Sequence, residues 1–583
     1  MLGIQGSIFS ITLGIKKEHI ETFHLAEMQD LHNLVRQFGE PEAENKTNRL
    51  IELLNKKPTN AESLIEYHEA LIFILAYPDN QTILELAKTS LLKCGEWSKL
   101  WFDKSRSKDL KHLEESGLNG TTLNAKFSYG LTSHLATKYQ KNIHLHSIEG
   151  DANRLREILQ FSMVGIEKET LPHSMEDLMM WLTDEAESDN KTSLEILLKA
   201  ISFFGKTALV SQTIFEFLSV FISIDFDLTF STRSFLAMET GKYFYQKNAL
   251  QKKIDLPALF ALPKPKIAKY KSTILIETAR LSLLSLAKET DPITFANPTE
   301  TTLYDLEKGL TYGLFHMLPA NRLPIDTYVG YMAFRNGIPI SYGGAWIVGN
   351  TAQIGINIYE TFRGGESAMM LCQLMRLYHK EYNIHFFRVE PYQLGHDNED
   401  GLKSGAFWFY YKLGFRPEEA KLKTVAESEW QKMQNKKNYR TPISTLKKLV
   451  QGYMGYFTCR EFPIIDSGII STWASEKIKT RFSGDRQLAA SQSISRMNSL
   501  LNLNYEEMNK WTKAEQDTYK SWCLFFYFSG EIPKIKKSEI AELIQMMKAK
   551  GSENEKTFVQ LWQKNKFVTL LNNQITKEQD EHD

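Results

Sequence analysis

Hydrophobic residues recur at helical spacing through most of the first 270 residues of the chain. Between positions 64 and 74, apolar side chains fall at i, i+3, i+7 and i+10, which places them on one helical face. The proline of the segment Tyr77–Asn80 ends this helix, because proline has no amide hydrogen and clashes with the preceding turn. A second apolar stripe, from Ile83 to Cys94, predicts a helix paired with the first. No fixed-period repeat accompanies the pairing, so we expect helical domains rather than a repeat array.

The proline-punctuated stretch Leu256–Pro265 predicts a domain boundary. Before it, the most apolar run is Thr207–Ile224, which Gln212 and Glu216 interrupt. A membrane span needs about 18 apolar residues with few or no charges, so this run predicts a buried core helix. Beyond the boundary, the apolar run within Ala279–Phe295 is expected to be the first strand of a new domain.

An antiparallel meander is predicted next. Tyr328–Phe334 and Ile340–Val348 have the composition of strands, and Asn336-Gly337 lies between them. Asn-Gly favours the positive backbone angles that a tight hairpin needs. A second turn at Gly349-Asn350 leads to a third strand, Thr351–Tyr359. Three consecutive strands should therefore form one sheet.

Helices and one further strand follow the meander. Apolar positions predict a helix from Ala368 to Met375, a strand at Ile384–Val389 and a helix from Ala406 that ends at Gly414. From about residue 426 helices resume, the clearest being Ser538–Lys550. The chain is thus expected to be α+β, with helical domains at 1–150 and 151–270, a mixed domain at 275–425 and a helical C-terminal region at 426–583.

Composition excludes several classes of protein. The 583 residues include 70 basic and 70 acidic side chains, 42% are hydrophobic and 24% are charged. These values are ordinary for globular chains and rule out collagen-like and disordered proteins. Four scattered cysteines without a CxxC pair argue against a disulfide framework and favour a reducing compartment. The apolar start, Met1–Ile15, has its lysines after rather than before it, unlike a signal peptide, so a cytoplasmic protein is expected.

The sequence predicts no metal centre and no membrane or nucleic-acid partner. His144 and His146 could share one side of a strand, but no cysteine, and no carboxylate nearer than Glu149, completes a ligand set. No membrane-spanning run is present, and zero formal net charge gives no bulk attraction to nucleic acid or anionic lipid.

Two segments of the mixed domain have a distinctive composition. Ile356–Ala368 (INIYETFRGGESA) leads from a strand through a Gly-Gly loop into a helix, and Ala406–Pro417 (AFWFYYKLGFRP) is an aromatic helix followed by Gly-Phe. With the order strand, strand, strand, helix, strand, helix, these segments resemble the GNAT (Gcn5-related N-acetyltransferase) superfamily. The first is similar to its fourth strand and pyrophosphate loop, Q/R-x-x-G-x-G/A, and the second to the A-x-x-x-Y-x-x-x-G-F ending of its fourth helix. The resemblance covers roughly a quarter of the chain.

The resemblance implies acetyl-CoA or another acyl-CoA as co-substrate. A loop that enters a helix presents unpaired N–H groups and the positive end of the helix dipole, which together bind phosphate. The alternative is a plain Gly-Gly turn between strand and helix. The residues implied to hold the cofactor are Ile358, Arg363, Gly364, Gly365, Ser367 and Ala368.

Glu366 departs from the family pattern. When Arg363 is aligned with the first motif position, Glu366 stands where the central glycine belongs, while Ala368 fits the last position. A carboxylate there is expected to repel a pyrophosphate and crowd its approach. Two alternatives follow: the loop is offset so that Gly364 and Gly365 serve instead, or coenzyme A binding is impaired.

The resemblance also implies a general acid. The tyrosine that matches Tyr410 often protonates the departing thiolate in the family, and a phenol of pKa about 10 suits a thiol of pKa about 8.5. Tyr411 is the neighbouring alternative on another helical face. A purely structural role, in which the run Phe407–Tyr411 packs the helix against the sheet, is the competing interpretation.

The remaining chemistry needs a base and an oxyanion donor. In the family's reaction, the acceptor amine attacks a thioester that is held beside a splayed fourth strand. A base must therefore keep the amine neutral, and a backbone N–H must stabilise the oxyanion. The strand Asn357–Tyr359 should supply that donor, and Glu360 and Glu390 are the candidate bases. For both carboxylates, a solvated surface role is the alternative.

Two further stretches differ from the family. The connection Glu390–Gly401 is longer than the family's usual strand-to-helix connection, and it carries a polar cluster, His396 to Asp400, at the mouth of any cleft formed there. That cluster could recognise a substrate or simply be a solvated loop that caps the helix. After Pro417, the segment Glu418–Gln434 has the pattern of a charged helix rather than the expected closing hairpin.

Three functions are therefore open. The first is an acyl-CoA-dependent N-acyltransferase that acts on an unidentified amine, with helical flanks that recognise a macromolecule or bind a protein partner. The second is a helical interaction protein that carries a degenerate, non-catalytic GNAT-like module. The third keeps the fold but takes an aminoacyl-tRNA donor, which the neutral net charge disfavours.

Overall fold

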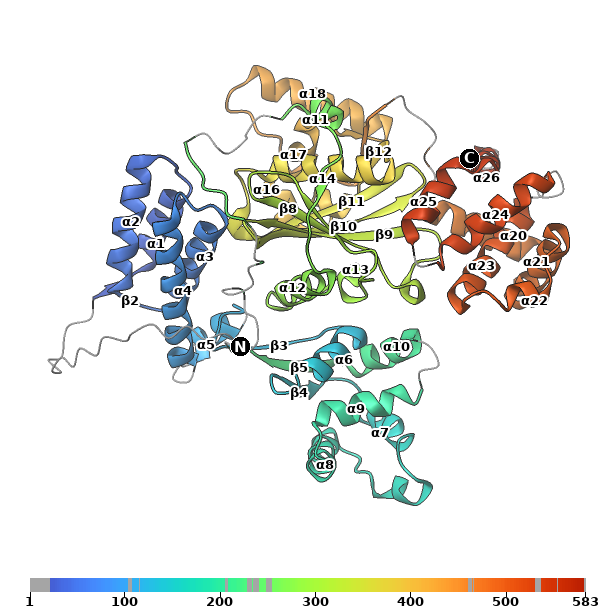
Figure 1. Ribbon diagram of the computed structural model, residues 1–583, viewed down its shortest axis with the longest axis horizontal. Helices are drawn as coiled ribbons and strands as arrows, with labels where there is room; N and C mark the ends of the chain where they lie inside the picture. The colour runs from blue at the N-terminus through green and yellow to red at the C-terminus, as the bar shows by residue number, and fades with distance from the viewer. Residues whose placement is uncertain are drawn as a thin grey trace.

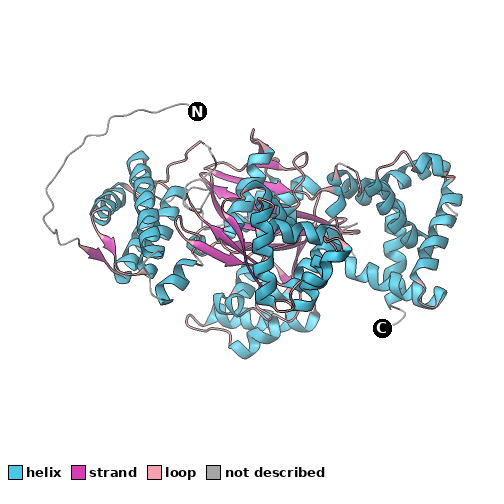
Figure 2. Cartoon of the chain, turned by 90° about the horizontal axis from the view of Figure 1, so that it is seen from below, coloured by secondary structure: helices cyan, strands magenta, loops and turns pink. Residues whose placement is uncertain are grey.

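The computed structural model describes residues 21–102, 107–114, 116–204, 208–227, 233, 238, 241–247, 254–459, 464, 466–529, 536–552 and 554–580. The segment Met1–Ile15 lies outside them. Helical units lie at the two ends of the molecule, and a large sheet lies between them (Figures 1 and 2).

The N-terminal unit is a helical bundle beside a two-stranded parallel pair. Its helices α3 and α4 are the pair predicted from the apolar stripes, and Tyr77 ends α3 as expected. Asn60 caps α3 by accepting a hydrogen bond from the Ser63 N–H. The elements are β1 (Thr22–Phe23), α1 (Leu25–Val35), α2 (Glu40–Leu54), β2 (Lys57–Pro58), α3 (Ala61–Ala76), α4 (Gln81–Phe102) and α5 (Ser107–Glu114).

A small sheet follows where only helices were expected. Its strands are β3 (Thr122–Ala125), β4 (Ile143–Ile148) and β5 (Val220–Asp225), in the order β3-β5-β4. The predicted boundary at residue 150 therefore separates β4 from its partner β5. The run Thr207–Ile224 is not one helix, because α10 ends at Leu218 and β5 begins at Val220. The helices are α6 (Tyr129–Lys138), α7 (Ala152–Gln160), α8 (Met175–Ser188), α9 (Ser193–Ser202) and α10 (Ala208–Leu218), with the 3-10 helix η1 (Gly165–Thr170).

The centre of the molecule is a nine-stranded mixed sheet, in the order β13-β14-β12-β11-β10-β9-β8-β7-β6. All neighbours are antiparallel except β11 and β12, which are parallel. The α+β prediction is confirmed, and the sheet reaches beyond the predicted end at residue 425. Its strands are β6 (Lys266–Ile267), β7 (Thr302–Asp305), β8 (Leu310–Phe315), β9 (Thr327–Arg335), β10 (Ile338–Val348), β11 (Thr351–Ile358), β12 (Phe386–Val389), β13 (Arg416–Pro417) and β14 (Met454–Phe457).

The predicted meander is confirmed as β9, β10 and β11. Asn336 and Gly337 adopt φ values of 50° and 83°, and the strands they join pair from Ile338 and Arg335 onward. Two consecutive positive φ angles are what a tight hairpin turn requires, so the Asn-Gly dipeptide sets the register of β9 and β10. That register carries through β10 to β11, where Ser341 pairs with Ile358.

Helices cover both faces of this sheet (Figure 1). On one face, α14 (Ser367–Tyr382) buries Leu371, Met375 and Tyr378 in the main core. On the other, α12 (Ser272–Leu284) packs Leu275 and its neighbours against residues of β7, β8 and β9. The strand expected within Ala279–Phe295 was therefore wrong, because this run forms the end of α12 and the short helix α13 (Asp291–Thr294).

The remaining helices of the centre lie around the edge that carries β12 to β14. The expected charged helix is confirmed as α18, and the closing strands β13 and β14 flank it and its neighbour α19. Strands β13 and β14 pair antiparallel, although two helices lie between them in the chain. The helices that lie around this edge of the sheet are α11 (Leu256–Ala261), α15 (Pro391–Leu394), α16 (Glu399–Ser404), α17 (Ala406–Lys412), α18 (Ala420–Asn435) and α19 (Ile443–Leu449).

The C-terminal unit is helical from α20 onward, whereas the predicted helical region 426–583 also contains strand β14 of the central sheet. Its core is aromatic, with Trp522 fully buried among Phe526, Phe558 and Trp562. The helix predicted at Ser538–Lys550 is observed as α24. The helices are α20 (Ser467–Phe482), α21 (Arg486–Leu501), α22 (Tyr505–Met508), α23 (Lys513–Ser529), α24 (Lys537–Ala549), α25 (Glu555–Lys564) and α26 (Lys566–Asp580). No described helix of the chain has the length and the apolar character that crossing a bilayer demands.

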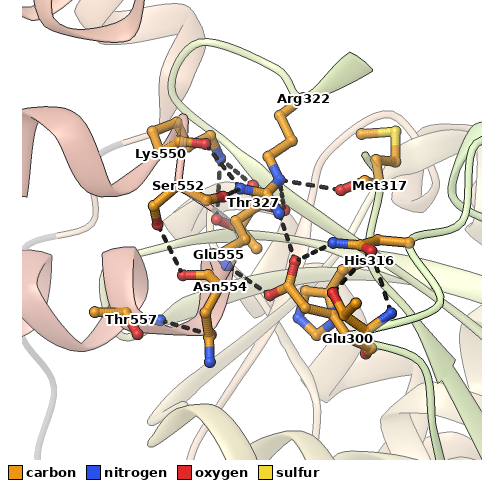
Figure 3. Close-up of polar contacts among 12 residues, drawn as sticks. Glu300, His316, Met317, Arg322, Thr327, Lys550, Ser552, Asn554, Glu555 and Thr557 are labelled. Atoms are coloured by element: carbon orange, nitrogen blue, oxygen red, sulfur yellow. Dashed lines mark hydrogen bonds and ion pairs between the residues drawn. The ribbon is translucent and has the colours of Figure 1, made fainter. Parts of the chain in front are cut away.

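A buried ionic network attaches this unit to the sheet (Figure 3). Arg322 donates to Glu300 and to the Lys550 carbonyl oxygen, and Lys550 donates to Glu555 and, at 3.0 Å, to Thr327 Oγ1. All four charged side chains of this network are at most 7% exposed. Two cations and two anions therefore compensate one another across the junction of the two units.

Candidate functional site

The strands β11 and β12 separate after a short stretch of pairing. They pair only from Thr351 with Phe386 to Gln353 with Arg388, while β11 stays paired with β10 as far as Ile358. Past Gln353, one edge of β11 therefore has no neighbouring strand among the residues that the structure describes. At a rise of about 3.3 Å per residue, five residues of open edge span roughly 16 Å.

The register decides which backbone groups line this gap. The Tyr359 N–H donates to the Ile340 carbonyl oxygen on the β10 side, whereas the Ile356 N–H donates to Gln393 Oε1 at 3.0 Å on the opposite side. Because successive residues of a strand alternate, Ile354, Ile356 and Ile358 present their N–H and C=O groups to the gap. Of the predicted donor strand Asn357–Tyr359, only Ile358 therefore directs its backbone groups to the gap, because the alternation turns Asn357 and Tyr359 toward β10.

A cleft of about 1180 Å³ opens from this gap. One wall is the end of β11 with the loop that follows it, and another is the segment from α15 to α17. The cleft brings together eight of the nine site residues expected from the sequence: Ile358, Glu360, Arg363, Gly364, Gly365, Ser367, Ala368 and Tyr410. Glu390, the ninth, does not line it.

The loop before α14 is open toward the cleft. Gly364 and Gly365 have φ values of 81° and 45°, and a Cβ added at either would meet no other atom within 4 Å. The Ser367 N–H donates to the Gly364 carbonyl oxygen, and the N-cap residue of α14 makes no side-chain cap hydrogen bond. The N-terminus of a four-turn helix, with its partial positive charge, therefore faces this space.

The side chain of Glu366 does not enter the cleft. It is 6% exposed and accepts a hydrogen bond from Arg335 Nη2, and Arg335 also stacks on the rings of Tyr77 and Tyr245. The expectation that this carboxylate would repel an anion at the loop was therefore wrong. Its charge is compensated by a buried guanidinium on the far side of the loop.

Tyr410 and Tyr411 face different surroundings. Tyr410 lines the cleft, where its hydroxyl donates to Gln393 Oε1 at 3.4 Å, and burial raises the pKa of this phenol well above its usual value. Tyr411 instead packs its ring against Trp430 and carries the Arg416 guanidinium 4.0 Å from its ring centre. Of the two candidates, only Tyr410 lines the cleft, and its raised pKa makes this phenol a weaker proton donor toward a thiolate than an ordinary tyrosine would be.

The two candidate bases differ in position and in pKa. Glu360 begins the 3-10 helix η3 (Glu360–Phe362) and is exposed at the cleft. Glu390 precedes α15, where its carboxylate accepts a hydrogen bond from Gln353 Nε2 at 3.3 Å, and burial raises its pKa. A base must reach the proton that it removes, so the position of Glu360 at the cleft favours it over Glu390.

The N-terminal helices supply a wall that the sequence did not predict. Arg36, at the end of α1, donates to the carbonyl oxygens of Thr361 at 2.9 Å and Arg363 at 3.2 Å. Glu69 of α3 pairs with Arg233 at 2.6 Å and accepts a hydrogen bond from the Thr361 hydroxyl. Burial alone would raise the pKa of Glu69, but the charge of Arg233 and hydrogen bonds from His68 and Arg233 outweigh it, so the pKa lies well below the usual range.

The long connection after β12 folds into two short helices, α15 and α16. Asn398 caps α16, and both Asn398 and Asp400 line the cleft. Another acidic residue of the predicted polar cluster near the cleft mouth, Glu399, pairs with Lys403 on the surface at 2.8 Å. The predicted helix cap is thus present, and the residues that line the cleft leave substrate recognition by this stretch a prediction.

No group of three or more His, Cys, Asp or Glu residues in the described part of the chain is placed to hold a metal ion. Comparison of the chain with protein-family models, with curated proteins and with solved structures finds no match in any of the three.

Proposed function

We propose that this chain is an acyl-CoA-dependent N-acyltransferase whose GNAT-like domain spans roughly residues 275–425. The observation that carries the proposal is the gap between β11 and β12, which opens into a cleft bounded by the N-terminus of α14 and by Tyr410. A thioester needs an extended slot for its arm, an anion site for its pyrophosphate and an acid for its leaving group. All three requirements have counterparts around this one cleft.

The loop before α14 suits a pyrophosphate. Its glycines admit a ligand close to the backbone, the helix N-terminus favours negative charge, and Arg363 is exposed at the cleft. Glu366 is turned away and paired, so the first alternative, in which Gly364 and Gly365 serve, fits better than impaired binding. The pantetheine arm would then lie along the open edge of β11.

The reaction would be direct. The amine nitrogen attacks the thioester carbonyl carbon, the C–N bond forms, and the backbone N–H group of Ile358 would stabilise the oxyanion. As the C–S bond breaks, the Tyr410 hydroxyl gives its proton to the thiolate sulfur. Glu360 is the cleft carboxylate positioned to take the proton that the amine loses.

The arrangement of elements supports a GNAT-like topology. Three antiparallel strands, a helix, a parallel strand and a second helix follow in the expected order, and the sheet closes with an antiparallel pair.

The helical flank also has a place in this proposal. Because α1 and α3 contribute His32, Arg36, Glu66 and Glu69 to the cleft, the acceptor amine would approach against the N-terminal unit.

A second candidate is a helical interaction protein with a non-catalytic GNAT-like module. One observation favours it: the side chain of Gln393 already occupies the gap beside Ile356, where the thioester would have to lie. Under this alternative the gap never admits a ligand. The two candidates therefore differ in whether an acyl-CoA binds at all.

Calorimetric titration of the full chain with acetyl-CoA and with a longer acyl-CoA separates them. We expect dissociation constants in the micromolar range, because a pyrophosphate site and an extended slot act together. Arg363→Ala should weaken binding by about tenfold, since one charge-assisted contact contributes roughly 1.5–3 kcal/mol at full strength and less when exposed. The matched control is Arg486→Ala, an exposed arginine of the C-terminal unit. Absence of heat with both thioesters would remove the transferase proposal.

The assignment of the base can be tested with two isosteric variants. We expect Glu360→Gln to lower kcat/KM by about tenfold, because the amine loses its proton acceptor, and Glu390→Gln to change it by less than about twofold. The measurement is thiol release from acetyl-CoA in the presence of a panel of primary amines. A larger loss of kcat/KM in Glu390→Gln than in Glu360→Gln would assign the role of base to Glu390. Strands β11 and β12 would then have to open further than observed.

A further inference from the structure

Gln393 lies where β11 and β12 diverge. It belongs to α15, the short helix that follows β12, and its side chain reaches back across the gap. One oxygen atom, Oε1, accepts hydrogen bonds from the Ile356 N–H at 3.0 Å and from the Tyr410 hydroxyl at 3.4 Å. Both partners are donors, so the oxygen of the amide, and not its nitrogen, must face them.

These two contacts tie Gln393 to the machinery of the proposed reaction. Ile356 is one of the strand residues that present their backbone groups to the gap, and Tyr410 is the proposed acid. In a parallel sheet, the next strand would satisfy the Ile356 N–H. Here the side-chain amide of Gln393 accepts the hydrogen bond instead. The Ile356 N–H therefore has a partner although the two strands have separated.

A pantetheine arm carries the same group. Each of its two amides has one carbonyl acceptor and one N–H donor, as a backbone or glutamine amide does. A carbonyl of that arm would find the Ile356 N–H already bonded to Gln393. The arm and the Gln393 side chain therefore compete for one donor, and only one of them can hold it.

We propose that Gln393 is a built-in occupant of the thioester slot, which acyl-pantetheine must displace in order to bind. This proposal rests on the proposed acyltransferase function. Displacement frees the Ile356 N–H for the ligand and, in the same movement, releases the Tyr410 hydroxyl to face the thioester sulfur. In the absence of ligand, Gln393 thus keeps the Ile356 N–H paired. This stabilises the free protein, since an unpaired buried donor costs free energy.

The test compares two ligands on three forms of the full chain. Acetyl-CoA reaches the gap, whereas adenosine 3′,5′-bisphosphate, the nucleotide end of coenzyme A, does not. The variant Gln393→Ala removes the competing amide. The control Gln353→Ala removes an amide of the same size from β11 at the last paired position, where the strands have not yet parted.

We expect Gln393→Ala to bind acetyl-CoA about three- to tenfold more tightly than wild type, because the ligand no longer breaks two hydrogen bonds. Its affinity for adenosine 3′,5′-bisphosphate should stay within twofold, and Gln353→Ala should leave both affinities unchanged. The ratio of the dissociation constants for acetyl-CoA and adenosine 3′,5′-bisphosphate is the quantity that tests the proposal. A general loosening of the fold would change both constants and leave their ratio unaltered.

Other outcomes have distinct meanings. Unchanged or weaker acetyl-CoA binding by Gln393→Ala, with wild type still binding, overturns the displacement proposal and leaves the transferase intact. No binding of acetyl-CoA by any form overturns both. Gln393→Asn, which keeps the amide but shortens its reach, guards against misfolding: it should show the same direction of change as Gln393→Ala, and wild-type behaviour would contradict the proposal.

Discussion

Replacing Glu366 by glycine is expected to lower the free energy of unfolding by about 3–5 kcal/mol. Restoring the glycine of the family motif would not improve the loop, because the Glu366 carboxylate is the partner of the buried Arg335 guanidinium. Removing one member of a buried pair leaves the other charge uncompensated. Thermal and denaturant unfolding, monitored by circular dichroism, should both show the loss.

Two further variants test the cause of this loss. The double substitution of Arg335→Met with Glu366→Leu removes both charges, so it should recover most of the stability that the single change costs. Glu399→Gln removes a carboxylate from the exposed pair with Lys403 and should leave the unfolding transition nearly unchanged. If Glu366→Gly were as mild as Glu399→Gln, the buried pair would not be an energetic element of the loop.

Tyr410→Phe should lower the rate of acyl transfer by about 10²- to 10⁴-fold, the usual contribution of a positioned general acid. Binding of acetyl-CoA should change little, because phenylalanine keeps the ring contacts with Phe409 and Phe415. The matched control is Tyr411→Phe on the same helix, whose hydroxyl does not face the cleft. A loss of binding in place of a loss of rate would assign Tyr410 to the ligand pocket rather than to proton transfer.

The pH dependence offers a second view of the same residue. An acid must be protonated to act, and burial raises the pKa of Tyr410 above its ordinary value of about 10. Activity that depends on this phenol should therefore persist through pH 9 and fall only above pH 10. An alkaline limb near neutrality, retained in Tyr410→Phe, would belong to another group.

The parts of the fold that the sequence predicted well are those where local chemistry decides conformation. Asn336-Gly337 specifies a tight turn by itself, and the apolar stripes of α3, α14 and α17 need no distant partner to be recognised. The three-strand meander and the loop that follows it were located within one or two residues. Eight of the nine predicted site residues meet at the cleft for the same reason, since they lie on these elements.

The failures come from tertiary context. The run Ala279–Phe295 is apolar enough for a strand, but it is helical because α12 covers one face of the sheet. Glu366 was expected in the cleft because nothing adjacent in sequence shows Arg335, 31 positions earlier, as its partner. Arg36 and Glu69 approach Thr361 from about 300 positions away, and a single sequence carries no signal for such a contact.

The order of strands at the β12 edge has a consequence for how the chain folds. β14 lies between β12 and β13, although it follows both in sequence and is separated from β13 by two helices. Strands β12 and β13 therefore have no partner on their facing edges until residue 457 has been synthesised and has folded back. Closing so long a connection costs entropy before any pairing repays it. This edge of the sheet therefore cannot close before residue 457 is available, and until then its unpaired backbone is open to pairing with other chains.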